Sequence, residues 1–490
     1  MFKRGCLCNG TYNVGRRWIK LVTDAARPYT FVHRLDRFGE HPAYYLPSGE
    51  VINYAYLEKL VEKKEKRLVE TIPAGSLGAL SFSTTLDNVV TYIAALRLGR
   101  TLLLMSPGLS DEGTTRLIEK LKIATLINAD GTVVETGYTQ NVRRDCALML
   151  STSGSSGSPK SVMLTLDNLH ANAHAISQYL PIVNEDRAIT SLPLFYSYGL
   201  SILNSHLYKG ASVLLTEAPI LSKLFWNQFS KFAISSLSGV PFHYQLFRKL
   251  RLERQAYPHL RYLTQAGGKL TPEQADYVNT LSNQFNIPAF LMYGQTEATA
   301  RIAYLPPHLL NTFSDCIGRA IPEGELLLRD LDTKNKITDP YVAGELCYRG
   351  PNVMLGYASC VRDLTLNERV SELRTGDIAE QLPNGLFRIV GRLSRMIKIQ
   401  GQRLQLDDIE EILCKFNVSS CCCGSDDLLI VSYVGGDDNT PEQITSYLRE
   451  SLAIHPSFIK VVKLDSIPLL ANGKVNYQSL FLAVKESLSC

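Results

Sequence analysis

The sequence lacks the features that would place this protein in a membrane, on a nucleic acid or outside the cell. No stretch reaches the roughly 18 uncharged apolar residues that a membrane-spanning helix needs. The 51 basic residues nearly balance the 47 acidic ones, and no basic stripe with interleaved aromatics favours nucleic acid. The first residues include Lys3, Arg4, Arg16 and Arg17 but no apolar signal-peptide segment. We therefore expect a cytoplasmic protein with no membrane span and no nucleic-acid partner.

The eleven cysteines show no paired spacing that would predict a metal site or a disulfide framework. Cys6 and Cys8 have no second pair nearby. An odd cysteine count in a long chain without a secretory signal predicts reduced thiols, as in the cytoplasm. Internal repeats and long Pro/Gly/Ser linkers are also missing from the sequence.

Strand-like apolar runs alternate with helical patterns, which predicts an α/β fold. The candidate strands are Ala147–Leu150, Ser212–Leu215, Phe290–Tyr293 and Leu428–Val434. One helix start is explicit, because Thr271 can cap, Pro272 suits the first helical position and Gln274 completes a capping box.

A chain of 490 residues is too long for one small core. A new αβ pattern begins after the polar stretch Arg392–Arg395. We therefore predict a large domain of α/β layers over residues 1–393 and a small, mobile α+β domain over residues 394–490.

The strongest local signal is the loop Ser151–Lys160, which reads Ser-Thr-Ser-Gly-Ser-Ser-Gly-Ser-Pro-Lys. Glycines let a backbone wrap closely around phosphate oxygens, the hydroxyls add donors, and Lys160 adds a cation. It is not a Walker A loop, because Pro159 precedes the lysine. From composition alone, a flexible Ser/Gly linker is the alternative.

This loop resembles the signature of the adenylate-forming superfamily, which contains acyl-CoA synthetases, adenylation domains of peptide synthetases, and luciferases. Ser156 and Ser161 stand where that family usually has threonine and glycine, and both keep a small side chain. The resemblance implies that phosphate is bound by Thr152, Ser153, Gly154, Ser155, Ser156, Gly157 and Lys160.

Two further motifs follow in the order of that family. The stretch Gln265–Leu270 resembles its adenine-side turn, which implies contacts from Gly267, Gly268 and Lys269. The string Tyr293-Gly294-Gln295-Thr296-Glu297 resembles its most specific motif. There the resemblance implies that Tyr293, Gly294 and Gln295 bind the nucleotide, that Thr296 meets the α-phosphate, and that Glu297 helps to hold Mg²⁺.

The C-terminal motifs complete the resemblance. Asp377, in Thr-Gly-Asp, corresponds to the ribose-binding carboxylate, and Arg392 to a nucleotide contact. Ser394 aligns with the hinge residue, where a small polar side chain can still absorb a dihedral change. Lys474, after Asn-Gly, matches the catalytic lysine. Without the resemblance, it would be an exposed hairpin lysine.

The segment Pro193–Leu200 resembles the family's Pro-Leu-Phe-His stretch beside the acyl pocket. At the position that matches Tyr196, amino-acid-activating members typically carry an aspartate for the substrate ammonium. That aspartate is missing here, so we expect an acid without a free α-amine. The predicted pocket residues are Tyr196, Tyr198, Val240 and Pro241. An aromatic core cluster is the alternative for the tyrosines. His243 is expected on a helix surface.

The resemblance implies an AMP-forming, acyl-CoA synthetase-like ligase that uses ATP and Mg²⁺. The substrate would be a small carboxylic acid, and the acceptor either CoA or the phosphopantetheine of a carrier protein. Because the chain ends soon after Lys474, we expect any carrier to be a separate protein. A non-catalytic nucleotide-binding protein with the same fold is the alternative. A kinase-like phosphotransferase is disfavoured by the missing kinase motifs.

Overall fold

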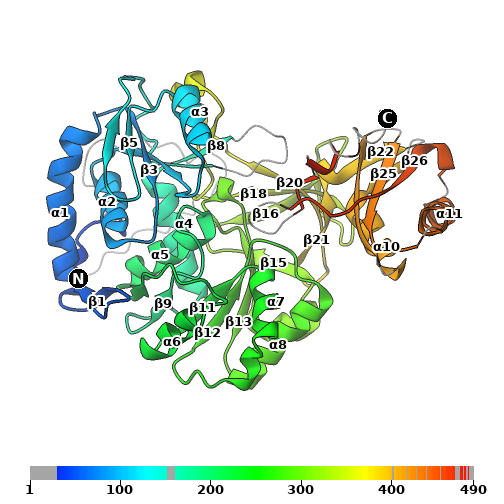
Figure 1. Cartoon of the computed structure of the whole chain (residues 1–490), viewed down its shortest axis with the longest axis horizontal. Coiled ribbons are helices and arrows are strands. Elements are labelled where there is room, and N and C mark those ends of the chain that lie inside the picture. The colour runs from blue at the N-terminus through cyan, green and yellow to red at the C-terminus, as the bar shows by residue number, and fades with distance from the viewer. Residues whose placement is uncertain are drawn as a thin grey trace, which may run out of the picture.

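The computed structural model describes residues 30–151, 160–399, 402–416, 418–425, 428–437, 439–452, 454–469, 475–477, 479–481 and 484. Figure 1 shows a large layered body, with the segment from β22 onwards to one side of it. The mixed α/β class predicted from the sequence is confirmed. In the described part of the chain, no helix is both long and apolar enough to cross a bilayer.

A seven-stranded sheet forms one layer of the large body, with strand order β19-β8-β7-β4-β3-β5-β6. Its inner pairs β4·β7, β3·β4 and β3·β5 are parallel, and the outer pairs are antiparallel. The strands are β3 (Leu77–Ser81), β4 (Thr101–Met105), β5 (Thr125–Ile127), β6 (Val133–Glu135), β7 (Leu148–Ser151), β8 (Ser161–Leu164) and β19 (Gly356–Ala358). The accompanying helices are α1 (Tyr54–Thr71), α2 (Leu86–Arg97), α3 (Asp111–Leu121) and α4 (Leu166–Tyr179).

A ten-stranded sheet forms the second layer, with order β11-β12-β13-β14-β15-β21-β20-β18-β16-β17. Its strands are β11 (Ser236–Gly239), β12 (Tyr262–Gln265), β13 (Ala289–Tyr293), β14 (Ala303–Leu305), β15 (Cys316–Ala320), β16 (Glu325–Arg329), β17 (Lys336–Ile337), β18 (Gly344–Arg349), β20 (Leu373–Gln381) and β21 (Phe387–Arg392). The helices here are α5 (Ser197–Lys209), α6 (Lys223–Lys231), α7 (Pro241–Lys249), α8 (Pro272–Phe285) and α9 (Leu310–Phe313).

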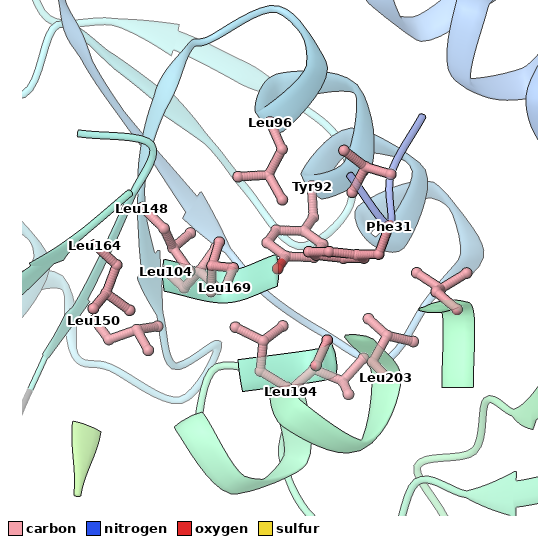
Figure 2. Close-up of a cluster of buried hydrophobic side chains, with 14 of the residues drawn as sticks. Phe31, Tyr92, Leu96, Leu104, Leu148, Leu150, Leu164, Leu169, Leu194 and Leu203 are labelled. Carbon is pink, nitrogen blue, oxygen red and sulfur yellow. The ribbon is translucent and has the colours of Figure 1, made fainter. Parts of the chain in front are cut away.

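Helices α4 and α5 lie between these two sheets (Figure 1). A four-stranded sheet closes the body, in the order β2 (Val51–Asn53), β1 (Pro42–Tyr45), β10 (Ser212–Leu214) and β9 (Arg187–Ile189). Figure 2 shows the core beside α5, where Leu194 and Leu203 pack near Phe31 and Tyr92. The Tyr92 hydroxyl donates to Asn204 Oδ1 at 3.1 Å, so even this apolar core satisfies its buried phenol.

Local sequence explains how several elements begin. The side chain of Thr271 accepts a hydrogen bond from the Gln274 backbone N–H, and the Gln274 side chain accepts one from the Thr271 backbone N–H, so the predicted capping box at the start of α8 is confirmed. Strand β25 matches its predicted range, Leu428–Val434, and the other three predicted strands lie within one residue of β7, β10 and β13.

The segment after β21 builds a separate small lobe. It contains a β22 (Met396–Ile399) and β23 (Gln402–Gln405) hairpin, and a sheet of β24 (Ser419–Ser425), β25 and β26 (Ile459–Lys463). Helices α10 (Leu406–Leu413) and α11 (Thr440–Leu452) pack with them around a core that includes Ile399, Leu413, Val431 and Leu448. This core contains no residue before Ile397. The domain boundary at residues 393 and 394 stays a prediction.

Candidate active site

Tyr293 ends strand β13 and reaches Asp377 on strand β20. Its hydroxyl donates to Asp377 Oδ2 at 2.5 Å, and Arg392 Nε lies 2.7 Å from Asp377 Oδ1. Asp377 is only 2% exposed and pairs with Arg392 across β20 and β21. Burial and the Asp377 charge raise the pKa of Tyr293 well above its ordinary value, so the phenol stays a donor. Three residues that were predicted from three separate motifs therefore meet at one point.

The rest of the Tyr293–Glu297 string joins this cluster to helix α5. Gln295 Nε2 donates to the Thr375 carbonyl at 2.8 Å. Thr296 begins the 3-10 helix Thr296–Ala298, and its hydroxyl donates to Ser197 Oγ at 3.2 Å. A Cβ atom at Gly294 would lie 1.8 Å from the carbonyl oxygen of residue 300, so this close approach requires glycine.

Glu297 lies in a small polar cluster that the sequence did not reveal. Tyr357 donates to Glu297 Oε1 at 2.8 Å, and Lys160 Nζ lies 5.4 Å from the centroid of the Tyr357 ring. Strand β19 carries Tyr357 and pairs with β8, which begins immediately after Lys160. No local pattern in the sequence predicts this strand pairing, so sequence alone assigns no role to Tyr357.

We expect Tyr357→Phe to lower kcat/KM for Mg·ATP about 10-fold, because a hydrogen bond to a charged group contributes about 1.5–3 kcal/mol and Glu297 stays partly solvated. Steady-state kinetics at varied ATP measure this loss. Tyr277→Phe is a matched control, because the hydroxyl of Tyr277 on helix α8 also donates to a carboxylate, that of Glu253, at 2.9 Å. An equal loss in both variants would contradict a role of Tyr357 in the site.

Asn352 holds the loop that follows Glu297, and no sequence signal pointed to it. It is 1% exposed, and its amide donates to the carbonyls of Ala298 and Arg301 at 2.7 and 2.8 Å. The Thr299 hydroxyl donates back to the Asn352 carbonyl at 2.7 Å. This loop contains two successive non-glycine residues with positive φ, Thr299 at 57° and Ala300 at 106°. Such strained backbone persists only where surrounding contacts impose it.

The glycine turn lies against two predicted pocket residues. Gly267 has φ 87°, and a Cβ there would come within 3.1 Å of both the Tyr196 hydroxyl and Val240 Cγ1. A Cβ at Gly268 would meet Pro241 at 3.0 Å. The structure thus brings the predicted adenine turn beside Tyr196, Val240 and Pro241.

Lys269, in the same turn, is exposed. Burial and the neighbouring carboxylates Asp407 and Glu411 raise the pKa of Asp408 on α10, and the positive charge of Lys269 opposes that shift. The predicted adenine turn and the first turn of α10 therefore influence each other electrostatically.

Tyr198 is buried and His243 is half-buried, so neither side chain lies fully on the surface. Tyr198 is 2% exposed on α5, and its hydroxyl lies 2.9 Å from Thr264 Oγ1. The expected surface position of His243 on α7 is wrong. Its side chain is half-buried, its Nδ1 has no hydrogen-bond partner, and burial lowers its pKa to about 4. Gly239 permits this burial, since a Cβ there would lie 3.1 Å from His243 Cβ.

Ser394 is exposed in the 3-10 helix Leu393–Arg395, between two anchored arginines. On one side, Arg392 pairs with Asp377 in the large body. On the other, Arg395 is 8% exposed and binds Asp407 at 2.7 Å and Glu410 at 2.6 Å in the small lobe. The two arginines thus hold opposite lobes, and the residues between them have no comparable anchor among the described contacts.

Seven predicted residues lie outside the described part of the chain: Thr152, Ser153, Gly154, Ser155, Ser156, Gly157 and Lys474. The segments that flank them are described. Ser151 pairs with Ser161 in the β7·β8 ladder, and Leu469 forms an antiparallel bridge with Val475. The roles of all predicted site residues stay predictions.

Comparison with known proteins shows which proteins this chain is similar to. A family model described as AMP-binding enzyme matches residues 129–358. An oxalate–CoA ligase of Arabidopsis thaliana is 27% identical, over 86% of this chain and 92% of its own length. Tyrocidine synthase 2 of Brevibacillus parabrevis is 27% identical over 69% of this chain and 10% of its own length. The Bacillus subtilis O-succinylbenzoate coenzyme A synthetase, in complex with ATP and a magnesium ion, shares the fold with a TM-score of 0.75 at 20% identity, covering 92% of this chain and 99% of that one.

Proposed function

Since the chain belongs to the adenylate-forming (AMP-binding) superfamily, we propose that it activates a carboxylic acid with ATP and passes the acyl group to a thiol. In the first step a carboxylate oxygen attacks the α-phosphorus, an O–P bond forms, and pyrophosphate leaves with its bridging oxygen. In the second step a thiolate attacks the acyl carbon, the bond to the AMP oxygen breaks, and a thioester and AMP are released.

The observation that carries this proposal is the meeting of Tyr293, Asp377 and Arg392 beside Thr296. A flat ring suits an adenine face, and a buried carboxylate can accept both ribose hydroxyls. Arg392 supplies a fixed positive charge, and Thr296 supplies a small donor for the α-phosphate. These are the chemical groups that a nucleotide site needs, and they come from β13, β20 and β21 together.

Both reactants are anionic, so the site must offset repulsion in the transition state. Lys160 would supply positive charge where the Ser/Gly loop ends, and the loop itself would bind the departing pyrophosphate. Lys474 would bridge the attacking carboxylate and the nucleotide. These roles rest on the family resemblance joined to electrostatics.

The chain's donors fit a phosphate-bound Mg²⁺. No cluster of three metal-ligating side chains occurs in the described regions, and Glu297 is the one predicted ligand. Mg²⁺ commonly takes one or two protein carboxylates and fills its other positions with phosphate oxygens and water. When bound with ATP, the ion would neutralise phosphate charge, while Tyr357 would hold one oxygen of Glu297.

CoA is supported as the acceptor because the similarity to a CoA ligase extends over 86% of this chain and 92% of that ligase. The match to part of a peptide synthetase keeps carrier-bound phosphopantetheine as the second candidate. The absent ammonium-binding aspartate supports an acid without a free α-amine. A cytoplasmic location stays a prediction of the sequence.

We assign residues 1–393 and 394–490 to two domains that rotate about Ser394 between the two steps. The anchoring of Arg392 and Arg395 in opposite lobes supports this location for the hinge. Rotation would withdraw Lys474 after adenylation and open the site to the thiol.

We expect Ser394→Pro to keep acyl-AMP formation within about 3-fold and to slow thioester formation at least about 10-fold, because proline locks φ near −65°. Ser394→Ala should leave both steps unchanged, since only the dihedral freedom matters. Single-turnover assays with and without the thiol separate the steps. Equal slowing of both steps would locate the hinge elsewhere.

The test of the function is a panel of carboxylic acids incubated with Mg·ATP, with and without CoA. Pyrophosphate, AMP and ADP are resolved for each acid. Acid-dependent pyrophosphate and AMP are expected, with a thioester product when CoA is the acceptor. Formation of ADP would favour a kinase. ATP binding without pyrophosphate release from any acid would favour the non-catalytic alternative.

A further inference from the structure

A small polar cavity lies deep beside the predicted acyl pocket. Its walls come from α4, α5, β11, β12 and the loop before β14, and include Ser201, Ser205, His206, Thr264 and, from that loop, Arg301. Each of these five side chains belongs to a residue that is 4% exposed or less. Polar cavities inside proteins commonly hold water, so the unpartnered polar atoms at this one call for water or a ligand as their partner.

One face of α5 runs from the proposed reaction site to the cavity. Ser197, Ser201 and Ser205 are spaced four residues apart, which places them on the same side of a helix, about 6 Å from one to the next. Ser197 accepts the hydrogen bond from Thr296, and Ser205 lines the cavity. A second small cavity is lined by Ser197 and Ser201 and also by residues of β7 and α4.

Arg301 supplies a buried charge at this cavity. It is 2% exposed, its guanidinium carbon lies 4.1 Å from the Tyr198 ring centroid, and its Nε has no hydrogen-bond partner. Among the residues that the structure describes, no carboxylate lies within ion-pair distance of it. Arg374, Arg388 and Arg395, by contrast, all have carboxylate partners. A buried arginine without an acidic partner is costly unless a ligand supplies the anion.

The backbone is strained at the place that positions Arg301. Thr299 and Ala300 both have positive φ, and Asn352 holds the carbonyl of Arg301. The protein therefore retains an unfavourable local conformation directly before this side chain. Strain of this kind is concentrated at functional sites.

Two other residues that line the cavity have a buried polar atom without a hydrogen-bond partner, Tyr262 at its hydroxyl and His206 at Nε2. The Nδ1 of His206 lies 2.8 Å from the Ile202 carbonyl, which can only accept, so Nδ1 carries a proton. Burial lowers the pKa of His206, so the ring is neutral and its unpartnered Nε2 is an acceptor. A water molecule that donates both to Nε2 and to an anion on Arg301 would satisfy both.

We propose that the acid activated by this protein carries a second anionic group, and that Arg301 binds this group at the far end of the acyl pocket. This inference rests on the proposed function. The expected substrates are short acids with a carboxylate at each end. The reacting carboxylate would lie near Thr296 and Ser197, and the other would reach past Ser201 to Arg301.

The test compares pairs of acids that differ only in the distal group: pentanoate with glutarate, hexanoate with adipate, and benzoate with terephthalate. Pyrophosphate release from Mg·ATP gives kcat/KM for each. The wild-type protein is expected to favour the diacid of at least one pair about 10-fold or more. Arg301→Met should lower that preference about 10- to 100-fold, the size of a lost charge-assisted hydrogen bond.

Two further variants separate the charge from the fold. Arg301→Lys keeps the charge without the planar fork, so it should retain part of the preference. Arg319→Met makes the same substitution at an exposed arginine that lies 5.4 Å from the Tyr304 ring centroid, and it should leave the preference unchanged. Thermal unfolding and ATP affinity measured on every variant identify any general loss of structure.

The outcomes distinguish the two proposals. Pyrophosphate release that is equal for diacids and monoacids, or a preference that survives in Arg301→Met, would overturn the role of Arg301 and leave the proposed function standing. No acid-dependent release from any member of the panel would overturn the proposed function, and this inference with it.

Discussion

Asp377→Asn is expected to weaken ATP binding about 100-fold. The substitution keeps the shape of the side chain but removes the charge that accepts from Tyr293 and pairs with Arg392. Each hydrogen bond to a charged group contributes about 1.5–3 kcal/mol, and two ribose hydroxyls would lose such a partner. Calorimetric titration with Mg·ATP measures the affinity directly, without the need for an acid substrate.

The matched control is Asp315→Asn. Asp315 also pairs with an arginine, Arg388, at 2.7 Å, but it precedes β15 and lies outside the Tyr293–Asp377–Arg392 cluster. Its ATP affinity should equal that of the wild-type protein. An Asp377→Asn variant that bound ATP normally would remove the ribose assignment, and with it the main support for the nucleotide site.

Arg395→Met is expected to destabilise the small lobe by about 3 kcal/mol. Arg395 is 8% exposed and binds Asp407, Glu410 and the carbonyl of Cys422, while its guanidinium lies 3.8 Å from the Tyr477 ring centroid. Removing one partner of a buried ion pair costs about 3–5 kcal/mol, because the other charge stays buried. The lower end applies here, since the Asp407 side chain is 43% exposed.

The loss should depend on pH in a direction that a simple packing defect would not produce. Burial already raises the pKa of Glu410, and Arg395 opposes that rise. Without Arg395 the folded-state pKa of Glu410 should rise further, so the folded lobe binds a proton more tightly than the unfolded chain does. Stability is then regained as the pH falls through that pKa, and the deficit should be smaller at pH 5 than at pH 8.

Hydrogen exchange of the amides in β24 and β25 reports the small lobe separately from the large body. Arg388→Met is the control, with exchange followed on β20 and β21, because Arg388 lies on β21 and also binds two carboxylates but its side chain is 33% exposed. It should cost no more than about 1 kcal/mol. Equal effects of the two substitutions would show that the burial of Arg395 is not the decisive difference.

Arg392 anchors the chain in the large lobe and Arg395 anchors it in the small lobe, so the proposed hinge is limited to the residues between these two arginines. Asp377→Asn would then weaken one anchor and Arg395→Met the other. Ser394→Pro would restrict the residue between them without removing either. The three variants therefore separate nucleotide binding, lobe stability and rotation.

Local patterns in the sequence predicted what depends on neighbouring residues. The capping box at Thr271 and the range of β25 are confirmed. Helix starts and strand periodicity depend on contacts within a few residues, so the chain order contains them. The ordered motifs also led to the family, because residues that contact one ligand recur in a set order along the chain.

Tertiary structure decided which distant residues meet. Arg301 follows the recognised motif by only a few residues, yet its burial beside Tyr198 depends on the packing of α5 against the ten-stranded sheet. Tyr357 reaches Glu297 because β19 pairs with β8, and His243 is half-buried because Gly239 leaves room for it. Sheet register and burial join residues tens to hundreds of positions apart, and no local period in the sequence encodes those distances. The sequence by itself thus determined the chemistry of the motifs, whereas the surroundings of Arg301, Tyr357 and His243 came only from the folded chain.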